Sequence, residues 1–358
     1  MKYTLLPVAL ASALAGPAWS QDSSVVLFGM MDAAARHVSN EGRGSITSLA
    51  SGSNSTSRFG VRGSEDLGRG LSASFHLEHG IAIDTGSPAS ATLFWDRRAT
   101  VSLASAALGE LRAGRDFVPT YVNWGRYDPF SYVGVAGSNN LVSATPVGPI
   151  RSAFGTNPNT TVRASNAGQL LLPGGLGGFE GGLMLAAGEG GTVANGFTKV
   201  VSLRLGYAAG PVGVSAATAT SENNLTTNGK FKDIAIAGSY NAGVLRVSAA
   251  LRQFKYASAK QTNTLVGVTV PVGSGEIKAS WNRADMAGTV GAANIDGNDA
   301  SQIGLGYVHN LSKRTALYGT VARITNQGAA TYTVPGGPAG LAGGGKSTGV
   351  EAGLRHTF

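Results

Sequence analysis

Cysteine is absent from this chain of 358 residues, and charged residues make up only 13% of it. Without cysteine, neither disulfides nor thiolate metal sites can hold the fold together. No run of about 18 apolar residues follows the first twenty residues, so no transmembrane helix is predicted. Proline is scarce, with 13 residues against 53 glycines, and the absence of a three-residue repeat excludes collagen. Among the structures that cross a membrane, these absences leave the closed β-barrel.

The first twenty residues have the pattern of a secretory leader. Lys2 supplies a positive start, Leu5–Ala15 is apolar, and Ala18 and Ser20 are small residues at the two positions that a signal peptidase reads. We expect residues 1–20 to be a signal peptide cleaved before Gln21, and residues 21–358 to form a single domain. A buried helix of a cytosolic domain is the alternative.

Segments with a period of two recur along the rest of the chain. In the last of them, Val350–Phe358, apolar side chains alternate with Glu351 and Arg355. A period of two places alternate side chains on opposite faces of a strand. An apolar face backed by a charged one suits a wall between lipid and water. His356 interrupts the apolar face and is expected at the rim.

The other alternating segments predict the size of the barrel. They lie at 25–36, 58–63, 71–81, 97–104, 111–116, 201–207, 245–252 and 277–282. Tight turns alternate with longer polar connections, a feature typical of outer-membrane barrels. The longer connections are expected at 37–56, 82–93, 188–197, 222–229, 286–299 and 326–346. The pattern predicts an all-β fold, an antiparallel transmembrane barrel of sixteen strands, and the weak alternation between 157 and 190 leaves fourteen or eighteen open.

One connection is far longer than the others. About forty residues separate Asp116 from the next strand-like run, whereas most connections have about two to six. Because this segment contains Trp124, Phe130 and Tyr132, it is not a simple flexible linker. An ordered aromatic loop must pack on a surface, and the barrel interior is the nearest one. We therefore expect residues 117–157 to form an inward-folded constriction loop, with an external lid or a disordered loop as the alternative.

Several motifs resemble those of the Gram-negative general porins, specifically their beta-proteobacterial branch. The most specific match is Ser57–Leu71, SRFGVRGSEDLGRGL, which resembles that family's second strand, turn and third strand. Further matches are SVVLFG at 24–29, LGELRAGR at 108–115, DPF at 128–130, LSKRT at 311–315 and GLRHTF at 353–358. The resemblance implies a homotrimer in the outer membrane of a Gram-negative bacterium, each barrel being a water-filled channel narrowed by its third loop.

The resemblance also implies a set of wall arginines that face acidic residues on the third loop. By position, Arg58 and Arg97 match two of these arginines, and Arg151 or Arg163 matches a third. Arg98 has the opposite parity to its neighbour, so we expect it on the other face.

Two departures from the enteric members leave the charge arrangement across the channel open. The third loop lacks their Pro-Glu-Phe-Gly-Gly element, so its acids are reduced to Asp116 at its root and Asp128. Met30 also stands where enteric members carry a lysine.

The expected function follows from the charges that line the narrow zone, because their sign sets selectivity. A barrel of sixteen strands is wide enough for an aqueous channel, and guanidinium groups stay charged at any relevant pH. The expected lining residues are Arg58, Arg97, Arg112, Arg151 and Arg163 on the constriction wall, Arg126 and Asp128 on the loop, and Arg36, Arg62, Arg204, Arg246 and Arg252 along the lumen. The width of the barrel predicts general diffusion of small hydrophilic solutes. Because these arginines outnumber the nearby acids, they predict a preference for anions, including phosphate and small carboxylates.

Other readings of the same residues remain open. Individual arginines could have structural roles, at the rims or paired across strands with Asp32, Asp233 or Glu351. A substrate-specific channel for small anionic or carboxylate solutes is the main alternative function, and an outer-membrane phospholipase or a passenger-type adhesin are weaker ones.

Neither a cofactor nor a metal site is expected. His76 and His79 are three residues apart on a predicted strand, which places them on opposite faces. No nucleophile elbow or phosphate loop is present, so no enzyme is predicted, and the basic residues are too scattered for nucleic acid. The expected partners are membrane lipid, lipopolysaccharide and, through Phe358, the barrel assembly machinery.

Overall fold

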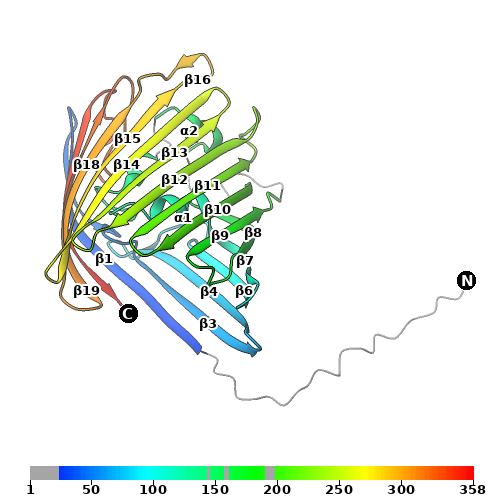
Figure 1. Cartoon of the computed structure of the whole chain (residues 1–358). Coiled ribbons are helices and arrows are strands. Elements are labelled where there is room, and N and C mark those ends of the chain that lie inside the picture. Colours follow the sequence, from blue (N-terminus) through cyan, green and yellow to red (C-terminus); the bar gives the residue numbers. More distant parts are fainter. Residues whose placement is uncertain (1–23, 143–145, 157–160, 190–197) are drawn as a thin grey trace, which may run out of the picture.

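The computed structural model describes residues 24–142, 146–156, 161–189 and 198–358. The expected signal peptide and its cleavage point before Gln21 lie outside these residues. The main sheet is antiparallel and closes on itself, because the first strand, β1 (Ser24–Asn40), pairs with the last, β20 (Lys346–Thr357). Figure 1 shows the tilted strands surrounding the interior.

Eighteen strands belong to this closed sheet. Between β1 and β20 they are β2 (Gly44–Ser51), β3 (Arg58–Gly68), β4 (Leu71–Ala82), β5 (Ser87–Pro88), β6 (Arg98–Ser105), β7 (Gly109–Phe117), β8 (Arg163–Leu171), β9 (Phe179–Ala186), β10 (Lys199–Ala209), β11 (Val212–Glu222), β12 (Phe231–Asn241), β13 (Arg246–Tyr256), β14 (Ala259–Val272), β15 (Gly275–Ala287), β18 (Ala300–Asn310) and β19 (Thr315–Asn326). Because β2 and β3 both pair with β1 as two halves of one wall strand, and β5 adds only two residues to β4, sixteen strands make up the wall. This confirms the predicted number.

The remaining elements lie in the connections. Between β7 and β8 are the helix α1 (Pro119–Gly125), the 3₁₀ helix η1 (Ser138–Leu141) and the helix α2 (Pro149–Phe154). The short strands β16 (Thr289–Val290) and β17 (Ala293–Asn294) form a separate hairpin. Among the described residues, no helix has the length and apolar character needed to cross a membrane.

Burial alternates along the wall strands and so identifies their two faces. In β13, Ser248, Ala250 and Arg252 are buried, whereas Val247 and Leu251 are exposed. Large exposed apolar side chains recur at alternate positions around the barrel, as expected for a surface that contacts lipid. The buried set therefore faces the interior.

The expected long connection at 37–56 is wrong. The structure continues β1 to Asn40, turns within three residues, and returns as β2 in register with β1. Period-two alternation is not visible in β2 because its two large apolar residues, Ile46 and Leu49, have opposite parity. Backbone pairing with β1 forms this strand despite the weak side-chain pattern.

Apolar packing inside the barrel is concentrated between the β7–β8 connection and the wall. Trp124, Tyr132 and Phe154 of the connection pack with Phe231 and Phe254 on the inner faces of β12 and β13. The aromatic residues that made this segment unusual in the sequence are thus its contacts with the wall.

A second interior cluster involves the connection between β19 and β20. Its residues Tyr332 and Val334 are buried together with Val38 of β1, Ile324 of β19 and Val135 of the β7–β8 connection. Two loops therefore share the interior on the side of the barrel where the first and last strands meet.

Candidate functional site

The connection between β7 and β8, residues 118–162, reaches across the interior. The Ser248 hydroxyl of β13 donates to the Tyr127 carbonyl at 2.7 Å, and Glu351 of β20 accepts from the Val135 amide at 3.2 Å. These wall residues lie on the inner faces of strands in different parts of the barrel, and Figure 1 shows α1 within the ring of strands. We refer to residues 118–142 and 146–156 of this connection as the interior loop.

Asp128 organises the interior loop. Its carboxylate accepts the backbone N–H groups of Phe130, Tyr132 and Ser138 at 2.9 to 3.0 Å, and the Ser138 hydroxyl at 2.6 Å. The indole N–H of Trp124 donates to the same hydroxyl at 2.9 Å. Burial raises the pKa of Tyr132, so its hydroxyl stays neutral. Asp128 is on the expected loop, but its carboxylate is directed into the loop itself.

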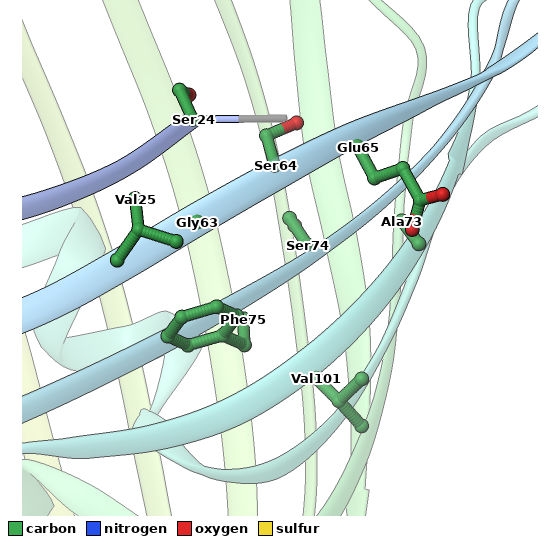
Figure 2. Close-up of a pocket in the computed structure, with 9 residues that line it drawn as sticks. All are labelled: Ser24, Val25, Gly63, Ser64, Glu65, Ala73, Ser74, Phe75 and Val101. Atoms are coloured by element: carbon green, nitrogen blue, oxygen red, sulfur yellow. The ribbon is translucent and has the colours of Figure 1, made fainter. Parts of the chain in front are cut away.

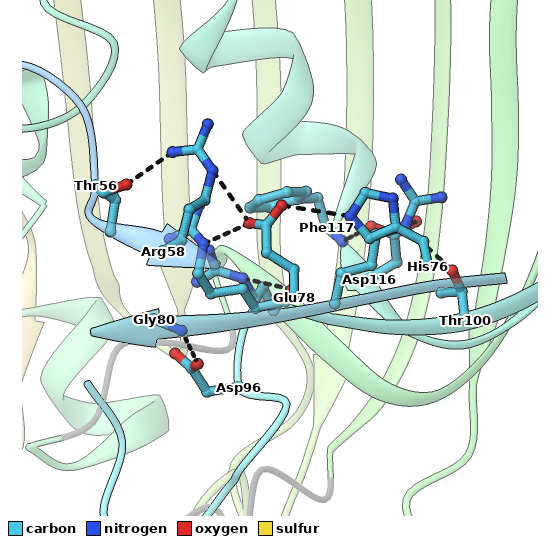
Figure 3. Close-up of polar contacts among 12 residues, drawn as sticks. Thr56, Arg58, His76, Glu78, Gly80, Asp96, Thr100, Asp116 and Phe117 are labelled. Carbon is cyan, nitrogen blue, oxygen red and sulfur yellow. Dashed lines mark hydrogen bonds and ion pairs between the residues drawn. The ribbon is translucent and has the colours of Figure 1, made fainter. Parts of the chain in front are cut away.

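Glu78 joins the first pair of wall arginines. It lies on the inner face of β4, where its Oε1 atom is 2.5 Å from Nε of Arg97 and 3.7 Å from Nε of Arg58. The imidazole of His76 is 3.4 Å from the other carboxylate oxygen. Figure 3 shows the side chains of Arg58 and Glu78 directed toward each other over β4. One carboxylate is thus shared by two guanidinium groups.

Asp116 joins a second pair. Its Oδ2 atom is 2.7 Å from Nη1 of Arg112 on β7 and 3.5 Å from Nε of Arg98 on β6. Arg112 also contacts Glu110 at 2.8 Å. The two pairs lie on neighbouring strands, β3, β4, β6 and β7, and form a patch of alternating charge on the inner wall.

The expectation that Arg98 could not share a face with Arg97 is wrong. Arg98 has the same parity as the buried Thr100 and Ser102, whereas Val101 and Leu103 of the opposite parity are exposed. Arg98 therefore belongs to the inner face of β6. Arg97 precedes the first residue of that strand, so strand parity does not determine where its side chain points.

Of the two candidates for a third wall arginine, Arg163 lies beside the first pair. It begins β8, its Nε donates to the Arg97 carbonyl at 3.0 Å, and its guanidinium lies 4.5 Å from the centre of the Phe117 ring. Arg151, by contrast, lies on the helix α2 of the interior loop and not on a wall strand. Its placement on the wall is therefore wrong.

Arg126 and Arg204 share a third carboxylate. Glu180 of β9 is 2.6 Å from Nη2 of Arg204 and also contacts Nη1 of Arg126 from the interior loop. Arg246 of β13 is exposed and donates to the Arg126 carbonyl at 3.1 Å. These groups continue the basic surface beyond the patch on β3 to β7.

Two of the expected lumen arginines are covered. Arg252 is fully buried and binds Asp233 at 2.7 Å beneath the interior loop. Arg36 binds Glu351 at 2.9 Å and is enclosed by the β19–β20 connection. Both lie on the inner face, but neither lines open space, because loops from distant parts of the chain cover them. Arg62 remains exposed on the inner face of β3.

The patch carries a positive excess. The guanidinium groups of Arg58, Arg97, Arg98, Arg112 and Arg163 are accompanied by three carboxylates, those of Glu78, Glu110 and Asp116. Sequence reasoning missed Glu78, Glu110 and Glu180 as the partners of the arginines. Alternation along β7 was enough to predict Glu110 as a partner of Arg112, because the two residues have the same parity. Glu78 and Glu180 lie on other strands than their arginines, so their prediction required knowledge of which strands are neighbours.

Two further observations add no residue to this site. The outer surface has an apolar groove whose lining includes Val25, Phe75 and Val101, and these side chains are directed outward from β1, β4 and β6 (Figure 2). No group of three His, Asp or Glu side chains able to hold a metal ion occurs in the described part of the chain.

Comparison with known proteins agrees with this architecture. The family model for Gram-negative porins matches residues 8–329. The chain is 36% identical to outer membrane porin protein 32 of Delftia acidovorans and 25% identical to an outer membrane porin protein of Bordetella pertussis, with all of each chain covered. Its structure resembles that of the anion-selective porin from Comamonas acidovorans, with a TM-score of 0.78, 34% identity, and coverage of 94% of this chain and all of that one. The chain belongs to the Gram-negative porin family.

Proposed function

We propose that this porin is a general diffusion channel of the outer membrane that prefers small anions such as chloride, phosphate and small carboxylates. The observation that carries the proposal is the patch on β3 to β7 together with Arg163 at the start of β8, where five guanidinium groups accompany three carboxylates on the inner wall. A channel selects ions by the sign of the charge along its narrow zone. The net charge of the patch is positive.

The surroundings of the patch strengthen its effect on ions. The wall and the interior loop are poorly polarisable, so they focus the potential of the arginines into the remaining aqueous space. Arginine does not lose its proton in the physiological range, and the excess charge is therefore permanent. The name of the related Comamonas acidovorans protein, an anion-selective porin, supports the same preference.

The assembly and the ends of the chain complete the proposal. We propose cleavage before Gln21, a homotrimer embedded in lipid and lipopolysaccharide, no catalytic activity, and Phe358 as the contact with the assembly machinery. A candidate surface for the trimer lies outside the barrel, where Phe59, His79 and Trp95 pack together with Phe94, which is 63% exposed. Phe358 is itself exposed at the end of the last strand.

The reversal potential across a planar bilayer with a salt gradient tests the anion preference. Wild-type protein should prefer chloride over potassium. Arg58→Ser and Arg98→Ser should each weaken that preference, because each removes one positive charge from the patch. Glu78→Gln should strengthen it, because the change removes a negative charge at the same level.

The control is Arg314→Ser, which removes an exposed charge from the turn between β18 and β19. This variant should keep the wild-type preference. A wild-type channel that prefers potassium would overturn the assignment of selectivity to the patch, and protein that forms no channel would overturn the proposed function altogether.

A further inference from the structure

Three lysines lie on the outer face of the wall. Lys232 of β12, Lys255 of β13 and Lys260 of β14 have the parity of the outward side chains of their strands, such as the exposed Ile234 and Leu251. The residues immediately before and after each lysine are buried and face the interior. The three lysines therefore point away from the channel, toward the surroundings of the barrel, and we call them the lysine row.

The members of the lysine row lie directly opposite one another. Lys255 is the cross-strand partner of Lys232 on one side and of Lys260 on the other. Side chains opposite each other on one face of a sheet have β-carbons about 4.5–5.5 Å apart, and like charges at this separation are destabilising. Within the described part of the chain, these three side chains form neither an ion pair nor a hydrogen bond. The described residues therefore give the row no counter-charge.

Other lysines on the same outer surface are paired. Lys199 at the start of β10 and Lys230 just before β12 both contact Glu222 at the end of β11, at 3.8 and 3.0 Å. Lys199 and Glu222 are also cross-strand partners. Here the chain places a carboxylate between two ammonium groups. The lysine row lacks such a carboxylate, so its counter-charge comes from outside the described chain.

The lysine row lies at the end of the barrel that carries the longer connections. The chain enters β1 and leaves β20 at the opposite end, where Gly29 and Phe358 are hydrogen-bonded. Because successive wall strands are antiparallel, β12 and β14 begin, and β13 ends, at the same end as the connection between β19 and β20. Figure 1 shows β16 at that end, far from the C-terminus. Longer loops of outer-membrane barrels are extracellular, so the row borders the outer leaflet.

Lysine is confined to that end in this part of the wall. Every lysine of β10 to β14 is the first, second or second-to-last residue of its strand, always at the end with the longer connections. Outward positions at the other end hold Tyr207 and Tyr240 instead. Aromatic residues are typical of both membrane interfaces, whereas cations at one interface alone fit an anionic lipid of one leaflet.

An apolar groove lies on the outer face between the lysine row and the other end of the wall. Its lining includes Leu205 of β10, Val214 and Ala216 of β11, and Ile236 of β12. Ile236 follows Lys232 by four residues on the same face, which is about 13 Å along the strand. Half of the hydrocarbon core of a bilayer is about 15 Å thick. A lipid whose phosphate lies at the row can therefore place an acyl chain in the groove.

The lysine row also faces lipid in the proposed trimer. In the closed wall of sixteen strands, β13 lies eight strands from β4 and so on the opposite side of the barrel. The strand β4 carries His79 of the candidate trimer surface. A second copy of the chain that binds at that surface leaves the row uncovered.

We propose that the lysine row binds the phosphate groups of lipopolysaccharide in the outer leaflet, with an acyl chain in the groove. Several phosphates on one molecule can neutralise three adjacent ammonium groups, whereas a zwitterionic phospholipid carries an ammonium group of its own. Clusters of basic residues at a membrane surface bind anionic lipid head groups in this way. The proposal deepens the proposed function, because it rests on the lipopolysaccharide surroundings of the barrel and not on the anion preference of the channel.

Titration of the refolded protein in detergent with fluorescently labelled lipopolysaccharide is the direct test. The triple variant Lys232→Gln, Lys255→Gln, Lys260→Gln should bind about 100-fold more weakly than the wild type, roughly a factor of five for each lysine. The corresponding triple arginine variant should retain binding, because it keeps the charges. Dephosphorylated lipopolysaccharide should bind the wild type as weakly as it binds the glutamine variant. Heat-modifiable mobility on SDS gels verifies that each barrel has formed.

The matched control removes three exposed positive charges from turns at the other end of the barrel. It is the triple variant Arg69→Gln, Lys313→Gln, Arg314→Gln, and it should keep the wild-type affinity for lipopolysaccharide. If the triple glutamine variant of the row fails to fold, Lys255→Gln alone removes the central charge. This single variant should weaken binding about fivefold.

The outcomes separate this proposal from the function on which it rests. Wild-type affinity in the folded glutamine variant would overturn it, as would an equal loss in the turn control or tight binding of dephosphorylated lipopolysaccharide. The glutamine variant should keep the wild-type reversal potential, because the row lies outside the channel, and a changed potential would contradict that placement. A wild-type channel that prefers potassium would overturn the proposed selectivity and leave the result on lipopolysaccharide binding intact.

Discussion

The arginines of this porin differ in what covers them, and that difference decides their roles. Arg62 and Arg252 both lie on inner faces of the wall, yet Arg62 is exposed and Arg252 is fully buried against Asp233. A buried guanidinium is tolerated only while its charge is paired and its N–H groups are hydrogen-bonded. Arg252 therefore contributes to the attachment of the interior loop, whereas we propose that exposed arginines act on ions.

The pair of Arg252 and Asp233 gives a prediction about stability. Asp233→Asn leaves the buried guanidinium without a counter-charge and should lower the free energy of unfolding by about 3–5 kcal/mol. The double variant with Arg252→Met should recover much of this loss, because it no longer buries a charge. As a control, Asp285→Asn removes an exposed partner of Arg283 and should cost less than about 1 kcal/mol. Urea unfolding of the refolded protein in detergent measures all three, and equal losses for Asp233→Asn and Asp285→Asn would contradict the assignment.

At the scale of elements, the interior loop is ordered by the wall and not by its own helices. The helix α1 has seven residues, and isolated helices shorter than about 12 residues are marginal in water. Proline at its start suits the first turn of a helix, but no side chain caps that end. Its order therefore depends on buried contacts such as those of Trp124, and on the carboxylate of Asp128.

Trp124→Ala tests this dependence. The indole is buried and donates a hydrogen bond, so its loss should remove about 3–5 kcal/mol of packing from the loop. The barrel should persist because its ladder is unaffected, while the loop should become susceptible to protease and the open-channel current noisier. Val122→Ala, on an exposed position of the same helix, should change neither quantity. Loss of the barrel itself in Trp124→Ala would show that the wall depends on the loop.

At the scale of the whole molecule, closure and charge act together. The ladder between β1 and β20 continues to the end of the chain, where Gly29 and Phe358 exchange two backbone hydrogen bonds at 3.1 Å. A closed sheet has no unpaired edge, so it can cross lipid, and its interior is left to loops and ions. In the proposed channel, the positive excess of the patch acts on every ion that passes.

The anion preference should depend on salt concentration. The screening length of the solution falls from about 10 Å at 0.1 M salt to about 3 Å at 1 M. The chloride preference of the wild type should therefore decrease as both compartments are raised to molar salt at a fixed gradient ratio. Reversal potentials at several concentrations measure the trend. A preference independent of salt would indicate selection by pore size or by direct binding instead of by the field of the arginines.

Parts of the site could be read from the sequence and parts could not. The parity of Arg112 and Arg58 on their strands was readable, because alternation is a local property. The sequence did not show that Arg97 and Arg98 both pair with interior acids. The strand β6 begins between these two residues, and the point where it begins depends on the preceding loop. Arg151 was assigned to the wall because the residues between 157 and 190 show little alternation. Residues 52–57 between β2 and β3 were not predicted as part of the wall, because a serine-rich stretch is typical of an ordinary loop.

The sequence by itself determined the barrel. A period of two, short turns and the lack of apolar helices are local features, and they predict an antiparallel barrel of sixteen strands with fourteen or eighteen left open. The strand pairing of the structure then fixed the number at sixteen. Only the tertiary structure decided which inner-face arginines reach open space. That choice depends on two interior connections and on residues 52–57 between β2 and β3, whose contacts join residues far apart in the chain, such as Gly134 with Ser53 and Val135 with Glu351. Burial of a side chain by a distant loop leaves no periodic trace in the sequence around it.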